Sequence, residues 1–139
     1  MKKITTVIVF VLAFSTLHAT SRYQHEKASE ELVLNNGTKW KIDQATGKNV
    51  SRLQQIAKKA DGHTMADYHM AGNTLQSGID QMIKECRMKG PDHLALHKWL
   101  EPLMEQVNQL RKATNAASAK IHFSAIKKRL ALFNQYFKV

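Results

Sequence analysis

The sequence predicts an all-α protein, an antiparallel up-down-up-down four-helix bundle, and three observations predict it. Apolar residues recur at three- and four-residue steps in four separate segments after Asp43. Turn- and cap-forming residues stand between these segments. No strand-rich segment, internal repeat or low-complexity tract competes with the helical pattern. Since an amphipathic helix cannot bury its apolar stripe alone, four helices joined by short connections are expected to pack together.

The beginning of the chain has the layout of a secretory signal peptide. Two lysines follow Met1, residues 4–14 are mostly apolar, and small residues near Ala19 offer a cleavage site. The apolar run is too short to span a membrane as a stable helix. We therefore expect a bacterial protein that is periplasmic or secreted, cut after Ala19 or, as an open alternative, after Ser15.

Three regions follow from these patterns: a signal peptide at 1–19, an N-terminal arm at 20–42 and a four-helix bundle at 43–139. Within the arm, Asn35-Asn36-Gly37 is a turn signal between apolar residues. It allows a small hairpin, but an isolated two-stranded hairpin is marginal in water. We therefore expect a short irregular or extended arm whose apolar residues pack against the bundle. These residues are Leu32, Leu34 and Trp40.

The first two helices are predicted from their apolar spacing and their ends. The first begins between Asp43 and Asn49 and ends at Asp61-Gly62. Thr64 and Asp67 have the spacing of a capping arrangement at the start of the second helix. The stripe of the first helix is Val50, Leu53, Ala57 and Ala60, and that of the second is Met65, Tyr68, Gly72, Leu75, Ile79, Met82 and Cys86.

The last two helices are separated by the segment KATNAAS. Gly90-Pro91 breaks the chain before the third helix, and proline suits a first helical position. Pro102 lies inside this helix and is expected to kink it near Lys98 and Trp99. The apolar stripe of the third helix is His93, Leu96, Leu100, Leu103, Val107 and Leu110, and that of the fourth is Ile126, Leu130, Phe133 and Phe137.

The chain is basic, with 21 Lys and Arg residues against 11 Asp and Glu, a formal net charge of +10. Removal of residues 1–19 with their two lysines leaves +8. Such a surface suits an anionic lipid, lipopolysaccharide or an acidic envelope protein as partner, and a basic surface that is only solvated is the open alternative. The basic residues are scattered without interleaved aromatic residues, so no nucleic-acid partner is expected. No integral membrane protein is expected either, and the oligomeric state stays open.

Cys86 is the only cysteine of the chain, and export would expose it to an oxidising compartment. A lone cysteine there is an intermolecular disulfide, a buried inert thiol or a metal thiolate. In an up-down bundle, the end of the second helix and the start of the third share one end. This topology predicts that four side chains converge there. They are Cys86, Met88, His93 and His97.

The donor types of this set favour copper. Thiolate and thioether prefer soft copper, and imidazole serves copper or zinc. Zinc ordinarily takes a Cys, His or carboxylate in place of a thioether, so Met88 favours copper over zinc. In the alternative interpretation, Cys86 and Met88 only fill the core, and the two histidines find hydrogen-bond partners in Asp92 or Glu85.

A second group of possible ligands lies at the start of the second helix. It would sit at the opposite end of the bundle, where the start of the fourth helix also arrives. The residues of this possible second metal site are His63, Met65, His69 and His122. Its presence would favour copper handling over catalysis.

The size, the export signal and the four helices resemble the periplasmic cytochrome b562 and cytochrome c′ class of bundles. The resemblance covers architecture alone, since the haem-attachment pattern C-x-x-C-H is absent at Cys86. The b-type layout, with a Met early in the first helix and a His late in the last, does not match either, because the one histidine of the last helix, His122, lies near its start. No haem is therefore expected. The run C-x-M-x-G from Cys86, followed by H-x3-H-x-W-L from His93, also resembles a motif of small exported bacterial proteins. This second resemblance implies no activity.

No catalytic activity is predicted. The chain has no Gly-rich phosphate loop and no G-x-S-x-G elbow, and a small bundle offers little cleft to Cys86 and His93 as a thiol-hydrolase pair. The predicted function is soft-metal binding by an exported protein, in sequestration, delivery or electron transfer. The alternative is a structural, interaction or inhibitor module of the envelope that acts through its basic surface.

Overall fold

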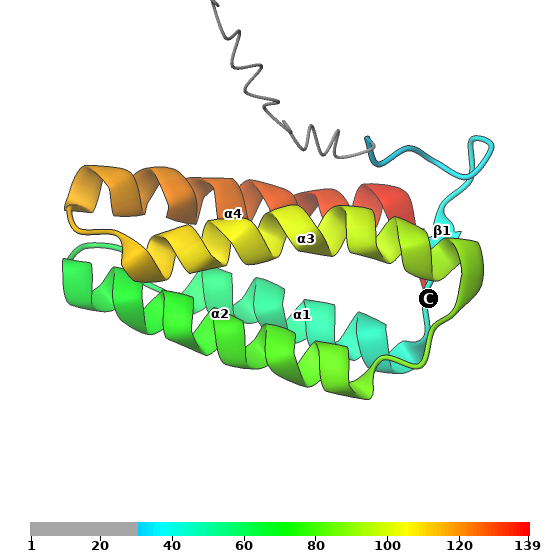
Figure 1. The fold of residues 1–139 in the computed structure, drawn as a ribbon, viewed down its shortest axis with the longest axis horizontal. Coiled ribbons are helices and arrows are strands. Elements are labelled where there is room, and N and C mark those ends of the chain that lie inside the picture. The colour runs from blue at the N-terminus through cyan, green and yellow to red at the C-terminus, as the bar shows by residue number, and fades with distance from the viewer. Residues whose placement is uncertain (1–30) are drawn as a thin grey trace, which may run out of the picture.

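The computed structural model describes residues 31–139, and the signal peptide predicted at 1–19 lies outside them. This part of the chain has four helices and two very short strands, which confirms the predicted all-α, four-helix fold class (Figure 1). No helix within it combines the length and the apolar character needed to cross a membrane. The helices are α1 (Gln44–Lys59), α2 (Met65–Glu85), α3 (Gly90–Lys112) and α4 (Ala116–Tyr136), and the strands are β1 (Trp40–Lys41) and β2 (Phe137–Lys138).

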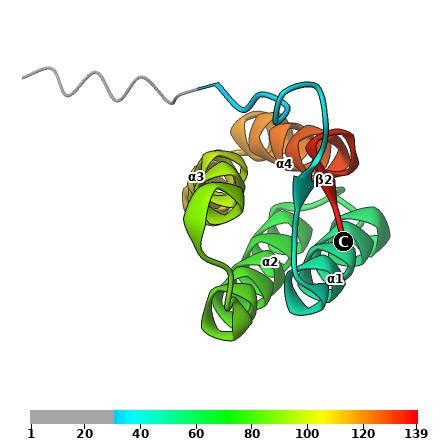
Figure 2. The same cartoon turned by 90° about the vertical axis from the view of Figure 1, so that its right-hand side faces the viewer.

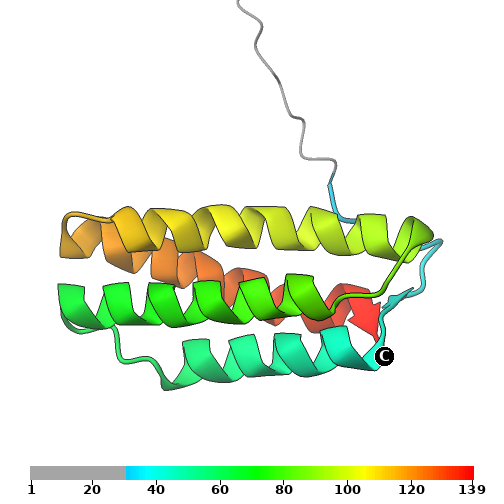
Figure 3. The same cartoon turned by 60° about the horizontal axis from the view of Figure 1, so that its bottom comes forward.

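The four helices surround a common core, as the end-on view in Figure 2 shows. Hydrogen bonds between neighbours give their relative direction. Asn49 near the start of α1 bonds to Glu85 at the end of α2. His69 near the start of α2 bonds to the Ala113 carbonyl directly after α3. The start of α1 and the end of α2 therefore lie at one end of the molecule, and the α2–α3 connection closes that end (Figure 3).

Three helices, α1, α2 and α4, begin at a capping side chain, whereas α3 begins at Gly90-Pro91 without one. Asp43 is the N-cap of α1 and accepts the Thr46 N–H at 2.7 Å. Thr64 and Asp67 form a complete capping box at the start of α2, in which each side chain accepts the other residue's backbone N–H. Backbone and side-chain hydrogen bonds from Thr64 hold the pKa of the Asp67 carboxyl below its usual range.

The core is built from the predicted apolar stripes. Its innermost side chains are fully shielded from solvent, and all four helices contribute to them. They are Leu53, Leu75, Ile79, Trp99, Leu103, Val107, Leu110, Ala119 and Ile126. Trp99 packs edge-on against Phe133, with ring centroids 4.7 Å apart. The helices hold together because these faces are removed from water jointly.

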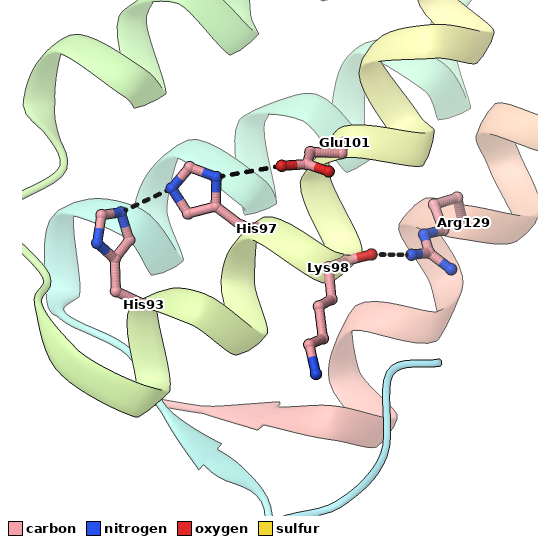
Figure 4. Close-up of polar contacts among 5 residues, drawn as sticks. All are labelled: His93, His97, Lys98, Glu101 and Arg129. Carbon is pink, nitrogen blue, oxygen red and sulfur yellow. Dashed lines mark hydrogen bonds and ion pairs between the residues drawn. The ribbon is translucent and has the colours of Figure 1, made fainter. Parts of the chain in front are cut away.

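Helix α3 continues through Pro102, from Gly90 to Lys112. Proline has no N–H, so the Lys98 carbonyl loses its usual helical donor. The guanidinium of Arg129 on α4 donates to this carbonyl (Figure 4). Through Nε, at 3.0 Å, it also donates to the Trp99 carbonyl. In return, Trp99 Nε1 donates to the Arg129 carbonyl at 2.9 Å. The backbone defect at Pro102 is thus repaired from the neighbouring helix.

The N-terminal arm makes a tight turn before it reaches the bundle. Asn36 and Gly37 both have positive φ angles, 49° and 81°, as a two-residue hairpin turn requires. The flanking Asn35 and Thr38 exchange backbone hydrogen bonds of 2.8 and 2.9 Å. The turn signal in the sequence therefore forms a turn, although no longer hairpin extends from it within the described residues.

The arm packs on the bundle through fewer apolar residues than predicted. Leu32 is buried and Trp40 is partly buried against the core, but Leu34 is 40% exposed, so the prediction for Leu34 was wrong. The arm is held instead by backbone pairing: β1 runs parallel to β2, with Trp40 beside Phe137. This contact anchors the beginning of the fold to its last residues.

Two glycines of α2 allow neighbouring helices to approach, and they give a testable contrast. A Cβ at Gly78 would lie 2.7 Å from Cδ2 of the fully buried Leu53, whereas one at Gly72 would meet Cγ of the exposed Arg111 at 2.8 Å. Gly78→Ala is expected to lower the free energy of unfolding by about 1–2 kcal/mol because the core cannot yield. Gly72→Ala should stay within about 0.5 kcal/mol of wild type, since the gain in helix propensity offsets movement of an exposed side chain. Urea unfolding followed by circular dichroism measures both, and equal losses would contradict the contrast.

Candidate metal centre

The candidate site begins where α2 ends. Cys86 is the C-cap of α2, and its N–H donates to the Met82 carbonyl at 2.9 Å. The Arg87 guanidinium donates to the carbonyls of Lys84 and Cys86, which covers the end of the helix. The Cys86 side chain is half-buried and packs against the core. The Cys86 thiol is therefore partly accessible to solvent.

Met88 lies in the connection between α2 and α3 and turns back toward α1. The hydroxyl of Thr46, which is 1% exposed, donates to the Met88 sulfur at 3.6 Å. Thr46 is itself held by Asp43, which caps α1. This contact gives the thioether a defined position beside a buried hydroxyl, which also lies close to the Asp43 carboxylate.

A buried amide fixes the last turn of α2 to the first turns of α1. Asn49 is 4% exposed, and its Nδ2 donates to the Ala45 carbonyl at 3.0 Å and to Glu85 Oε2 at 2.7 Å. Gln81 donates to the other carboxylate oxygen at 2.9 Å. The hydrogen bonds from Asn49 and Gln81 lower the pKa of the Glu85 carboxyl. Glu85, the residue before Cys86, is therefore ionised and links α2 to α1 through its hydrogen bond from Asn49.

The two histidines of the candidate site form a pair on the first turns of α3 (Figure 4). Their Nε2 atoms lie 3.1 Å apart, and their ring centroids 4.6 Å. At this separation one nitrogen carries a hydrogen and the other accepts it. The Nδ1 atom of His97 faces Glu101 Oε1 at 3.8 Å. His93, His97 and Glu101 therefore form a ladder at four-residue intervals on α3.

The structure brings together His93 and His97, but it leaves Cys86 and Met88 in contacts of their own. Within residues 31–139, no three His, Cys, Asp or Glu side chains are gathered where they could hold one metal ion. Cys86 packs against the core and Met88 against Thr46. All four residues belong to the same end of the bundle, and their joint role as ligands stays a prediction.

The possible second site has its histidines in separate contacts. His69 Nε2 bonds to the Ala113 carbonyl at 2.9 Å, and His122 Nδ1 bonds to Gln106 Oε1 at 2.9 Å. Met65 packs against the core, and His63 is exposed beside Asp67. His69 and His122 thus each link α3 to a neighbouring helix, and a second metal site also stays a prediction.

Sequence reasoning missed three polar residues around the candidate site. Thr46 and Asn49 lie in phase with Val50 and Leu53 on α1, and this placement of polar groups on an apolar stripe was the available signal. Glu101 stands four residues after His97, the spacing at which helical side chains meet.

Comparison of the chain with protein-family models, with curated proteins and with solved structures finds no match. The geometry described above therefore carries the functional inference.

Proposed function

We propose that the chain is an exported, antiparallel up-down-up-down four-helix bundle, freed of a signal peptide near Ala19, that binds a soft metal ion. Copper is the metal that the donor set favours, with zinc as the second choice. The ion would bind at the end of the bundle where α2 connects to α3. Sequestration, delivery or electron transfer are the roles that such a site can serve.

The observation that carries the proposal is the distance of 3.1 Å between the Nε2 atoms of His93 and His97. Metal–imidazole bonds measure about 2.0 Å, so two cis nitrogens on one ion lie about 2.8 Å apart at a right angle and about 3.3 Å apart at a tetrahedral angle. The observed separation falls between these values. A metal ion could replace the shared hydrogen with little movement of either ring.

Glu101 supports the same function as an orienting group. A carboxylate beside the second ring nitrogen of a ligating histidine fixes the ring and raises its basicity. The Nδ1 atom of His97 has Glu101 Oε1 in that position, at 3.8 Å. The ladder thus offers two nitrogen donors and an acidic partner, while its exposure leaves room for further ligands.

Cys86 and Met88 would complete the coordination as soft donors. The Cys86 thiol is only half-buried, and the connection that holds both residues is four residues long, from Cys86 to Lys89. Met88 would exchange its contact with Thr46 for a bond to copper, and this contact is a weak hydrogen bond to sulfur. Copper therefore has little to displace.

Titration of Cu(I) against a competing chelator tests this function. Cys86→Ala removes the only thiolate and is expected to lower affinity by at least about 100-fold, since loss of even an outer-shell partner costs 10- to 100-fold. His93→Ala and His97→Ala should each weaken binding, and Met88→Leu should weaken it modestly. Copper binding should also weaken as the pH is lowered, because protons compete with the metal for thiolate and imidazole.

Met70→Leu is the matched control for Met88→Leu, because this exposed methionine lies near the start of α2, at the other end of the bundle, and belongs to neither predicted metal site. It should bind Cu(I) at the candidate site as tightly as wild type does. Equal affinities of wild type, Cys86→Ala and His97→Ala would contradict the proposed site.

A further inference from the structure

The charges of the bundle are divided between its helices. Helices α1 and α4 each contain four Lys or Arg residues and not one Asp or Glu. Helix α2 has one basic and three acidic residues, and α3 has three of each. The pair α1 and α4 therefore carries +8, while α2 and α3 together carry −2. The basic residues are scattered along the sequence, but the excess of positive charge among the helices lies on α1 and α4.

Helices α1 and α4 lie side by side and form one flank of the bundle (Figure 2). Gln54 on α1 donates to the Leu130 carbonyl on α4 at 3.0 Å, which holds the two together near their middles. Two of the eight cations are used inside the fold: Arg129 bonds to α3, and Arg52 bonds to Gln81 on α2. The lysines of the pair are exposed. They are Lys48, Lys58, Lys59, Lys120, Lys127 and Lys128.

Two shallow hollows on this flank have no Asp or Glu side chain in their lining. One lies between α1 and α4, with Ala57 and Leu130 as part of an apolar floor and with Lys58 and Lys127 beside it. The other lies along α1, where Lys48 and Arg52 are the charged lining residues. A hollow over α2 and α3 is instead lined by three acidic residues. They are Asp80, Glu101 and Glu105, and Arg111 is the basic residue in the same lining.

We propose that the exposed flank of α1 and α4 is a docking surface for an anionic phospholipid bilayer. Clusters of four to eight basic residues suffice to hold a protein on such a surface, where each contributes on the order of 1 kcal/mol at the membrane. Five of the six lysines extend along much of both helices, from Lys48 to Lys58 on α1 and from Lys120 to Lys128 on α4, which suits a continuous negative surface rather than one compact ligand. The sixth, Lys59, lines a hollow toward α2 together with Asp61 and Asp67.

The kinds of side chain on the flank also favour a lipid surface over a folded acidic protein. The exposed cations are lysines, whose flexible stems place point charges among headgroups, whereas arginine forks serve paired recognition of carboxylates. Two exposed apolar side chains lie beside these cations: Ile121 follows Lys120 on α4 and is 67% exposed, and Val139, which follows β2 and lines the hollow with Lys48, is 73% exposed. They would enter the interfacial region between the headgroups.

The aromatic residues of α4 do not offer a base-stacking platform, because Phe123 and Phe133 are buried and Tyr136 is half-buried. Binding to this flank should therefore depend on the surface charge of a vesicle and not on a nucleic-acid base.

Co-sedimentation with vesicles tests the docking surface. Purified protein is expected to bind vesicles of phosphatidylcholine with phosphatidylglycerol, to bind those of phosphatidylcholine alone far less, and to be released by salt. The double variant Lys58→Glu with Lys127→Glu should bind the anionic vesicles about 30-fold more weakly, since two lysines are lost even before repulsion is counted.

The control variant is Lys84→Glu with Lys112→Glu, two exposed lysines on α2 and α3 that change the net charge equally. It should lose binding only severalfold, with helical content and melting temperature equal to those of the first variant. Equal losses in both variants would overturn the proposal, because net charge rather than the flank would then decide. Binding to soluble polyphosphate with none to anionic vesicles would overturn it as well. Since Lys58 and Lys127 line a hollow apart from the metal site, copper affinity should be unchanged in the first variant.

Discussion

Leu75→Asp is expected to unfold the protein or to lower its free energy of unfolding by about 4–5 kcal/mol. Leu75 is fully buried at the centre of α2. A carboxylate there has no cationic partner within reach in the apolar core, so it must either stay charged at a large desolvation cost or take up a proton. Since small domains are stable by only about 5–15 kcal/mol, one such substitution removes a large share of the total.

Ile83→Asp is the matched control on the same helix. Ile83 is 48% exposed, so the new carboxylate stays hydrated, and the change should cost less than about 1 kcal/mol. Circular dichroism at increasing urea concentration measures both variants. A Leu75→Asp protein as stable as Ile83→Asp would contradict the placement of Leu75 in the core.

Arg129→Met is expected to lower the free energy of unfolding by about 3 kcal/mol, more than substitution of a basic side chain on the surface usually does. The Arg129 guanidinium donates to the carbonyls of Lys98 and Trp99, and methionine fills similar volume without a donor. Loss of the guanidinium removes the donor that serves the Lys98 carbonyl in place of the missing Pro102 N–H, at about 1–3 kcal/mol in a partly buried site. The Trp99 carbonyl keeps the N–H of Leu103 within the helix. Burial lowers the pKa of Arg129 from its usual value, yet the group stays protonated at any pH of the experiment.

Pro102→Ala should rescue part of this loss, since alanine restores the N–H that the Lys98 carbonyl lacks. The double variant is therefore expected to be more stable than the sum of the single effects by about 1 kcal/mol, as contacts within one network are not additive. Urea unfolding of the four proteins in a double-mutant cycle measures this coupling. If the effects of the two substitutions on the free energy of unfolding were strictly additive, Arg129 would not compensate for the missing N–H of Pro102.

Much of the fold followed from local sequence signals. The apolar stripes placed Leu53, Leu75 and Leu103 in the core, where all three are fully buried. The capping pair Thr64 and Asp67 predicted the start of α2, because a side-chain oxygen three residues from an orphan N–H is a local contact, whereas the start of α1 was left between Asp43 and Asn49 and proved to have Asp43 as its cap. Such contacts depend on short stretches of chain and need no knowledge of the partner helices.

Contacts between distant residues escaped prediction. The parallel pairing of β1 with β2 joins Trp40 to Phe137, and neither segment reads as a strand by itself. Phe137 was predicted on the stripe of the last helix, but it follows that helix as the first residue of β2 and is still buried. The exposure of Leu34 has the same origin, since backbone pairing rather than apolar contact fixes the arm.

At the candidate site, too, some contacts followed from the sequence and others required the tertiary structure. Spacing alone determined that His93 and His97 meet, because residues four apart share a helix face, and it determined that Cys86 and Met88 lie at the same end. Only the tertiary structure decided that Met88 turns to Thr46 and that Asn49 anchors Glu85, since these partners come from α1. The total charge was likewise written in the sequence, whereas its concentration on α1 and α4 required the packing that sets the first helix beside the last.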